Sequence, residues 1–225
     1  MACVPCTGAD MKVIKNVLVL LADIANGLFA VLIAGYVSGT EVVWWHFVIG
    51  VLLAMSPDLD AIPELLRRGR VSCDAEYVSD HRDMLHYPVL FVLVGVLLIL
   101  FVNTFFGTMF LAATMLHFFN DFYGTGWGIP LFWPLTDRRY KFCARRAGRL
   151  KRLLKANGDW DTLPHDERRF KILVSWSRDE LDSYIERFGI DDWATPYYLT
   201  TNWVSGTEYA LFVVAVILAV NALLY

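Results

Sequence analysis

Cysteine is scarce in this sequence and follows no regular spacing. Four cysteines occur among 225 residues, at positions 3, 6, 73 and 143, which argues against a disulfide-stabilised scaffold. Cys3 and Cys6 have the CxxC spacing of metal and redox motifs, but no second CxxC accompanies them, so we predict no such site there. A cleavable signal peptide is also missing, because the first apolar stretch is long and no small-residue cleavage site follows it.

Lysine and arginine are absent from most of the chain. Two lysines lie in residues 12–15, four arginines in 56–87 and fourteen basic residues in 138–187, and none lies elsewhere. The net charge of -3 therefore says little about binding partners, because the charge is so unevenly distributed.

The segments without basic residues are strongly apolar. Hydrophobic residues make up 56% of the chain and the mean hydropathy is +0.45, which is too apolar for an ordinary soluble domain. A helix that crosses the roughly 30 Å hydrocarbon core of a bilayer needs about 20 residues. We predict an all-α polytopic membrane protein with about five transmembrane helices, over residues 16–37, 43–56, 88–102, 104–123 and 208–225.

The middle of the chain needs a turn for this count to hold. Residues 88–119 are almost continuously apolar, and one helix of that length would span roughly 48 Å, too long for a single crossing. We predict a helical hairpin that turns near Asn103-Thr104 or at Gly107. A single helix is the alternative, and it would place His117 on the other face of the membrane from the residues before 88.

With five crossings, every lysine and arginine lies on one side of the membrane, and the positive-inside rule makes that side cytoplasmic. The N-terminus is then cytoplasmic and the C-terminus outside. We divide the chain into a membrane domain (1–134) that carries the site, a small cytoplasmic helical cap (135–207) and a C-terminal transmembrane helix (208–225).

Three short stretches bring acidic and histidine side chains to the cytoplasmic end of these helices. They are Ser56–Asp60, His81–His86 and His117–Asp121. Carboxylates and imidazoles are ligands of divalent metals. In or beside a membrane they are costly unless they are paired, hydrated or metal-bound, so their convergence at one depth predicts a metal site.

Local spacing refines this prediction. His117 and Asp121 are i, i+4 and share one helical face. Pro57 disfavours helical geometry at the residue before it, and an extended Asp58–Asp60 stretch would direct both carboxylates to one site. The alternative is that one of these aspartates caps a short helix that begins near Pro63.

Asp23 lies inside the first apolar stretch, where an unpaired carboxylate costs about 2.5–3.5 kcal/mol on insertion scales. It either completes the site or pairs with Asn26, Asn120 or an arginine. His46 follows two tryptophans in an aromatic belt on the outer side, so we do not count it as a ligand. The candidate metal ligands are Asp58, Asp60, His81, His86, His117, Asp121 and Asp23.

The order of these motifs resembles the membrane-bound metal-dependent hydrolases of bacteria and archaea, the YdjM-like family. The resemblance rests on Pro57-Asp58-Leu59-Asp60, on the stretch from His81-Arg82 to His86, and on His117 to Asp121 followed by the glycine-containing turn from Tyr123 to Pro134. It covers about residues 43–135. It implies a hydrolase of the inner membrane whose metal is held by these residues.

We therefore predict metal-assisted hydrolysis at headgroup depth. One or two divalent ions, Zn or Mn, would activate water and polarise a carbonyl or phosphoryl oxygen. Arg82 would neutralise a phosphate or hold a ligand carboxylate, and Asp83 would act as a base or as a partner of a histidine. The alternatives are a membrane metal-binding or ion-transport protein without hydrolytic activity, and a structural protein whose polar groups pair helices.

The cap suggests the partners. The basic segment Arg145–Lys155 has the composition of a helix that lies on anionic lipid headgroups, and together with the depth of the site it favours a lipid-linked, phosphate-bearing substrate. A solvated charged face is the alternative reading. A nucleic-acid contact is disfavoured because no recognised binding motif accompanies the patch.

Overall fold

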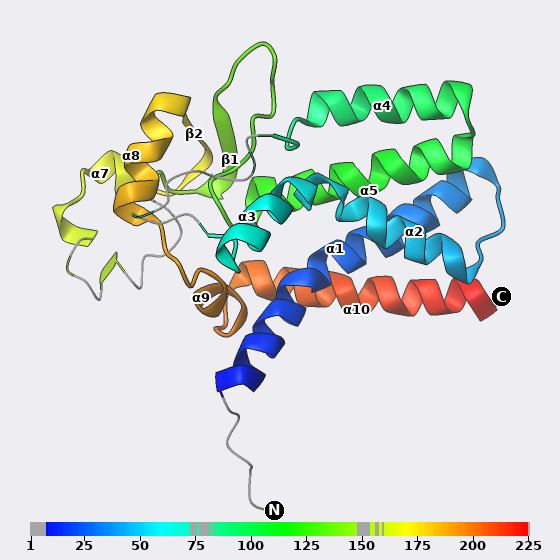
Figure 1. The fold of residues 1–225 in the computed structure, drawn as a ribbon, viewed down its shortest axis with the longest axis horizontal. Coiled ribbons are helices and arrows are strands. Elements are labelled where there is room, and N and C mark those ends of the chain that lie inside the picture. Colours follow the sequence, from blue (N-terminus) through cyan, green and yellow to red (C-terminus); the bar gives the residue numbers. More distant parts are fainter. Residues whose placement is uncertain are drawn as a thin grey trace, which may run out of the picture.

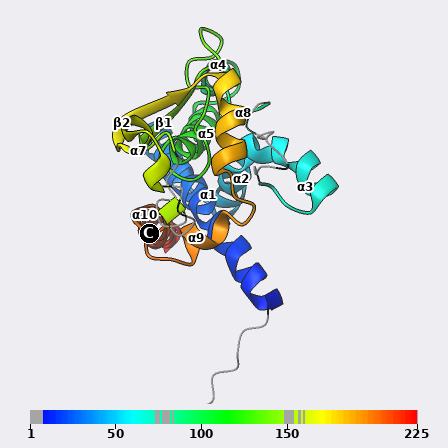
Figure 2. The ribbon, with the colours of Figure 1, turned by 90° about the vertical axis from the view of Figure 1, so that its left-hand side faces the viewer.

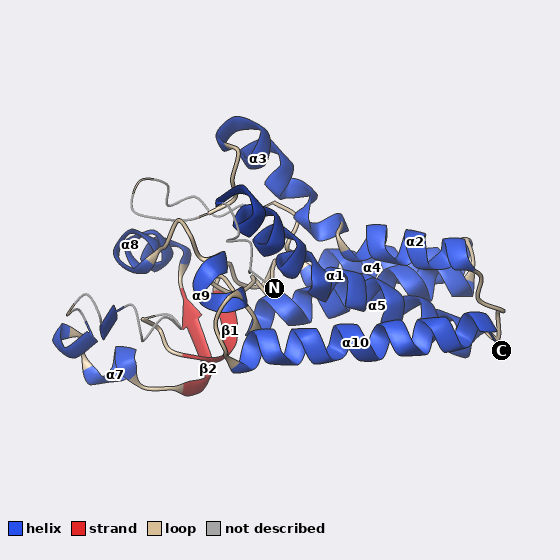
Figure 3. Ribbon diagram, turned by 90° about the horizontal axis from the view of Figure 1, so that it is seen from below, coloured by secondary structure: helices blue, strands red, loops and turns tan. Residues whose placement is uncertain are grey.

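The chain forms a bundle of helices with a smaller unit at one end. A computed structural model describes residues 8–72, 76, 82, 84–147, 154–155, 158 and 160–224, with side chains from residue 14 onward. The bundle helices lie side by side (Figures 1 and 3) and are α1 (Gly8–Ser38), α2 (Trp44–Ala54), α4 (Pro88–Phe101), α5 (Thr104–Tyr123) and α10 (Trp203–Leu224).

Two of the described helices are long and apolar enough to cross a membrane, Ile14–Ser38 within α1 and Trp203–Leu224. A third crossing results if α2 and the stretch Ser56–Arg68, bent by 50° relative to each other, count as one span. Helix α4 has only 14 residues, short of the roughly 20 that a crossing needs. The predicted count of five spans is therefore not supported, because apolar stretches that look alike in sequence differ in helical length.

The predicted hairpin between α4 and α5 is confirmed. Helix α4 ends at Phe101 and α5 begins at Thr104, with the side chain of Asn103 accepting hydrogen bonds from the backbone N–H groups of Phe105 and Phe106 at 2.7 and 3.3 Å. The cap satisfies donors that the first turn of a helix leaves without partners. Gly107 allows the helices to approach closely, since a Cβ there would lie 2.4 Å from the backbone nitrogen of Ile99.

Small residues line the contacts between the bundle helices. The buried core residues are Ala30, Val31, Ala34, Phe47, Ala54, Phe105, Met109, Ala113 and Ala219. Small side chains let helix backbones approach closely, which is how helices associate in lipid. Leucine and valine side chains of α4 and α10 are exposed on the outside of the bundle, as expected for surfaces that face lipid tails.

The unit next to the bundle is not purely helical, so the prediction of a helical cap is wrong in this respect. Strands β1 (Arg139–Ala144) and β2 (Lys171–Trp176) pair antiparallel, with Arg139 opposite Trp176. Helix α8 (Arg178–Phe188) follows β2 and begins with a capping box between Ser177 and Glu180. Buried residues of this sheet and α8 form a separate core, Ala144, Val174, Trp176, Leu181 and Ile185.

Short elements complete the fold. They are the 3-10 helix η1 (Ser56–Ala61), α3 (Ile62–Arg68), η3 (Trp160–Thr162), α7 (His165–Arg168) and α9 (Ala194–Tyr198). Helix α3 projects to one side of the bundle (Figures 2 and 3). The predicted basic helix Arg145–Lys155 falls largely outside the described residues. Of its arginines, Arg145 lies over the rings of Trp160 and Phe170, and Arg146 pairs with Glu180.

If α1 crosses the membrane with the orientation that the basic residues predict, its two ends differ in accessibility. We expect a cysteine at Thr40, beyond the end of α1, to react with an impermeant maleimide in intact cells. A cysteine at Asp161, an exposed side chain of the cap, should react only after lysis. The measurement uses a background in which the four native cysteines are serine, and labelling of both positions from one side would contradict the orientation.

Candidate metal centre

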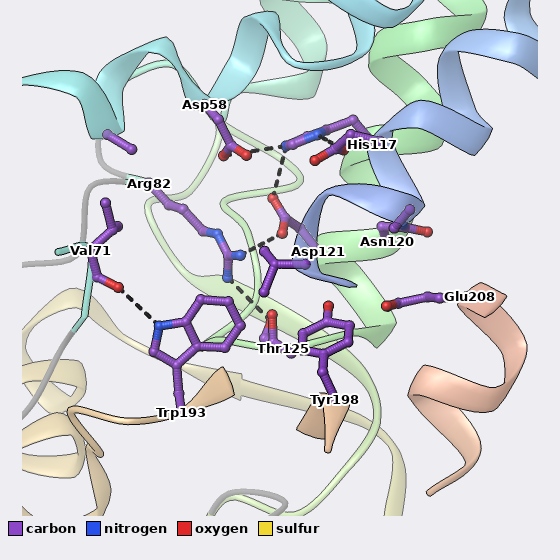
Figure 4. A pocket seen from close by; sticks show the side chains of 14 residues that line it. Asp58, Val71, Arg82, His117, Asn120, Asp121, Thr125, Trp193, Tyr198 and Glu208 are labelled. Atoms are coloured by element: carbon purple, nitrogen blue, oxygen red, sulfur yellow. Dashed lines mark hydrogen bonds and ion pairs between the residues drawn. The ribbon is translucent and has the colours of Figure 1, made fainter. Parts of the chain in front are cut away.

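The sequence-distant acidic and histidine side chains meet at the end of the bundle that adjoins the cap (Figures 1 and 4). Four segments contribute to the cluster: α1 with Asp23, η1 with Asp58 and Asp60, the segment before α4 with Arg82 and His86, and α5 with His117 and Asp121. The α4–α5 hairpin makes this possible, because it returns the end of α5 to the level at which α4 begins.

His117 is held between a carboxylate behind it and two in front. Its Nδ1 lies 2.8 Å from Asp23 Oδ1. Its Nε2 lies 3.6 Å from Asp58 Oδ1 and 3.4 Å from Asp121 Oδ2, and it makes no hydrogen bond with any described residue. In the neutral imidazole, a carboxylate at Nδ1 favours the ring proton there, which would leave the Nε2 lone pair directed at the cluster.

His86 repeats this arrangement from another segment. Its Nδ1 lies 3.1 Å from Asp60 Oδ2, which also accepts a hydrogen bond from the backbone N–H of Leu85 at 2.9 Å. Its Nε2 lies 3.1 Å from Asp121 Oδ2 and 3.3 Å from Asp58 Oδ1. Both imidazoles thus direct Nε2 at the same two carboxylates.

The charge of the cluster favours a cation. Burial alone would lower the pKa of the His86 imidazole, but its hydrogen bonds to Asp121, Asp58 and Asp60 outweigh burial and raise the pKa to about 10. This raised pKa reflects a surplus of carboxylates over the fixed positive charge in the cluster, and a proton or a metal ion would offset that surplus.

These atoms could hold a metal ion. One ligand atom each from Asp58, His86 and His117 lies within 4.8 Å of the others, and Asp121 Oδ2 is next to both imidazole nitrogens. The donor set of two imidazole nitrogens and carboxylate oxygens suits zinc and other borderline divalent metals. Asp58 is the most accessible of the carboxylates, with 39% of its side chain exposed, so the set opens on the Asp58 side.

Arg82 supplies the fixed positive charge. Its Nη2 lies 2.6 Å from Asp121 Oδ1, and its Nη1 donates to the carbonyl oxygen of Thr125 at 3.2 Å (Figure 4). Gly126 leaves room for this guanidinium: its φ is +77°, and a Cβ there would lie 1.8 Å from Arg82 Nη1. The prediction that Arg82 holds a ligand carboxylate is thus consistent with the geometry, with Asp121 as that carboxylate.

The structure differs from the sequence expectations in several details. His81 and Asp83 lie outside the described residues. The Asp58–Asp60 stretch is a 3-10 helix and not extended, and the N-cap of α3 is Ala61, so neither aspartate caps that helix. Asp23 pairs with His117. Asp23 contacts Nδ1 of His117 and Asp60 contacts Nδ1 of His86. Both predicted ligands are therefore on the far side of the rings from the point where the two Nε2 atoms converge.

A cavity of about 200 Å³ adjoins the cluster and is lined in part by residues that the sequence did not suggest. Trp193, Tyr198 and Glu208 form its far side. For Glu208 a signal existed, since it is the only charged residue of α10. Nothing in the sequence marked Trp193 or Tyr198.

A protein-family model described as YdjM inner membrane protein matches residues 21–155. The match includes every residue of the cluster and ends before Trp193. No curated protein and no solved structure matches the chain.

Some side chains of this cluster would bind the metal directly, and others orient a side chain that does. Replacing the two kinds should therefore change the metal content to different extents. We expect His117→Ala to remove most of the bound metal, because it deletes a convergent nitrogen. Asp23→Asn should weaken metal affinity by about 10–100-fold, because it loosens only the orientation of the ring. Metal analysis after equilibrium dialysis of detergent-purified protein measures both.

His46→Ala is the matched control. His46 is also buried, but its Nδ1 accepts from Val43 N at 3.2 Å at the start of α2, at the other end of the bundle. The metal content of the His46→Ala variant should equal that of the wild type. Full occupancy in the His117→Ala variant would show that the cluster is not the metal centre.

Proposed function

The chain belongs to the YdjM inner membrane protein family, and from the geometry of its site we propose that it is an integral-membrane, metal-dependent hydrolase. The observation that carries the proposal is the convergence of two imidazole Nε2 atoms and two carboxylates at the edge of a cavity, with a buried guanidinium beside them. Zinc or manganese is the ion that such donors favour.

Each side chain has a task in this reaction. His86, His117, Asp58 and Asp121 would hold the ion, and Asp23 and Asp60 would fix the two rings. A bound ion supplies an activated water and polarises the scissile group. Arg82 lines the cavity next to the ligand Asp121, so it is placed to stabilise an anion that develops on the substrate.

The surroundings support a phosphate ester that is linked to lipid. Asp58 and Ala61 line the cavity from η1, and exposed apolar side chains follow on η1 and α3: Leu59, Ile62, Leu65 and Leu66. A short helix with such a face is typical of the membrane interface. Arg67, exposed in its last turn, fits anionic headgroups.

The core of the bundle supports an enzyme over an ion path. Beyond the cluster, the described helices pack against one another through apolar residues, including Val31, Phe47 and Met109. An ion that crossed the membrane here would have to pass this mainly apolar layer, which offers few polar ligands among the described residues.

We expect Arg82→Ala to lower hydrolysis by about 10²–10³-fold, the loss typical of removing a donor that stabilises a developing anion. The metal content should fall far less than turnover, since a guanidinium cannot ligate a cation and its loss loosens only the orientation of the ligand Asp121. Turnover is measured on phosphomonoester and phosphodiester lipids with and without chelator, with metal analysis of the same samples. A parallel loss of metal and turnover would assign Arg82 a structural role, and unchanged turnover would remove it from catalysis.

Gly126→Ala tests the placement of the same guanidinium without deleting it. The new methyl group would collide with Arg82 Nη1, so turnover should fall while the metal is retained. Gly158→Ala is matched for backbone strain, because Gly158 has a φ of +80° and nothing within 4 Å of the added Cβ. Equal losses of turnover in the two variants would attribute the effect to the backbone and not to Arg82.

A further inference from the structure

The cavity has two chemically different sides. On one side lie the histidine–aspartate cluster and Arg82. On the other lie Trp193, Tyr198 and Glu208, which come from the segment after α8 and from α9 and α10 (Figure 4). The second side lies outside the residues that match the family model, so the family does not account for it.

Glu208 is an unusual residue for its helix. It is 3% exposed, and it is the only charged residue of α10, one of the two long apolar helices. Burying a carboxylate in such a helix is costly, so it is a functional hypothesis by default. Its side chain faces Tyr198 on the same side of the cavity and approaches the end of α5, where a Cβ on Gly124 would lie 3.5 Å from Glu208 Oε1.

Tyr198 keeps its proton beside this carboxylate. Burial, together with the charge and the hydrogen bond of Glu208, raises the pKa of the Tyr198 hydroxyl. The phenol therefore donates to the carboxylate at neutral pH. A carboxylate has about four lone-pair sites and a phenolic oxygen has two, so both groups can accept hydrogen bonds from a ligand in the cavity that they line.

We propose that Glu208 and Tyr198 form a subsite for a hydrogen-bond donor of the substrate, a hydroxyl or ammonium group next to the phosphate ester. The inference rests on the proposed function, in which Arg82 and the metal ligands take the phosphate. The carboxylate attracts donors and repels a second anionic group. The cavity, at about 200 Å³, is smaller than the roughly 300–1,000 Å³ pockets of drug-sized ligands, so it fits a headgroup and leaves acyl chains outside.

Three soluble phosphate esters test this subsite by binding. Glycerol 1-phosphate carries hydroxyl donors, phosphoethanolamine carries an ammonium, and methyl phosphate carries neither on its alkyl group. The full chain, purified in detergent and loaded with zinc, is titrated with each by calorimetry, while 31P NMR of the same samples records any cleavage. We expect a donor-bearing ester to bind about tenfold more tightly than methyl phosphate, the worth of one hydrogen bond to a charged group.

Glu208→Gln and Tyr198→Phe should each reduce this preference several-fold, with methyl phosphate affinity and zinc content unchanged. Preference for glycerol 1-phosphate would identify the donor as a hydroxyl, and preference for phosphoethanolamine as an ammonium. Glu186→Gln and Tyr36→Phe remove the same groups at exposed positions and should behave as the wild type. Thermal unfolding checks that each variant is folded.

The subsite is overturned if the wild type binds all three esters equally, if the preference survives in both variants, or if no ester binds the zinc-loaded protein. Failure of the hydrolase proposal has a different signature. In that case the donor-bearing ester still binds preferentially, but neither the soluble esters nor the phosphate lipids are cleaved.

Discussion

The pairing of buried carboxylates with imidazoles is the constraint on which the rest of this structure depends. An isolated carboxylate at membrane depth costs about 2.5–3.5 kcal/mol on insertion scales, and Asp23, Asp60 and Asp121 are all buried. Each is compensated by a group from a different segment: Asp23 by His117, Asp60 by His86 and Asp121 by Arg82. Separating any of these segments would leave a buried charge without its partner, so the cluster fixes α1, η1 and α5 relative to the segment before α4.

The sequence predicted the parts of this arrangement that follow from the turn in the apolar run and from helical spacing. The apolar run too long for one crossing was predicted to turn near Asn103 or Gly107 and return His117 to the level of His86, and in the structure Asn103 caps α5 at that turn. The i, i+4 spacing of His117 and Asp121 likewise placed both on one face. In each case a short-range rule decided the outcome.

The rest depended on tertiary contacts that no local rule contains. Which partner Asp23 takes is decided by how α1 packs on α5, and that partner is His117, not the predicted Asn26, Asn120 or an arginine. Pro57 disfavours helical geometry at Ser56, but it stands in the first turn of the 3-10 helix η1, where its missing N–H removes no hydrogen bond within the helix. Glu208 stands at the start of an apolar run, and only the tertiary structure places Tyr198 beside it. Strands β1 and β2 pair with each other across about thirty residues of sequence. The spacing of hydrophobic residues within either segment does not reveal such a pairing.

The two sides of the cavity are held by interactions of different strength. The metal-ligand side is fixed by buried charge pairs. On the opposite side, Glu208 belongs to the bundle helix α10, whereas the segment around Trp193 has ion pairs of Asp192 with Lys15 of α1 and of Asp191 with Arg70 after α3. Exposed pairs contribute roughly 0–1 kcal/mol each and are screened by salt. Directional hydrogen bonds add to these pairs: the Trp193 indole N–H donates to the Val71 carbonyl at 2.9 Å, the Ser72 hydroxyl to Asp191 at 2.8 Å and the Tyr209 hydroxyl to the Tyr198 carbonyl at 2.7 Å. The side that binds the ion is therefore held by buried charge pairs, and Trp193 and Tyr198 on the other side are held by single hydrogen bonds and exposed pairs.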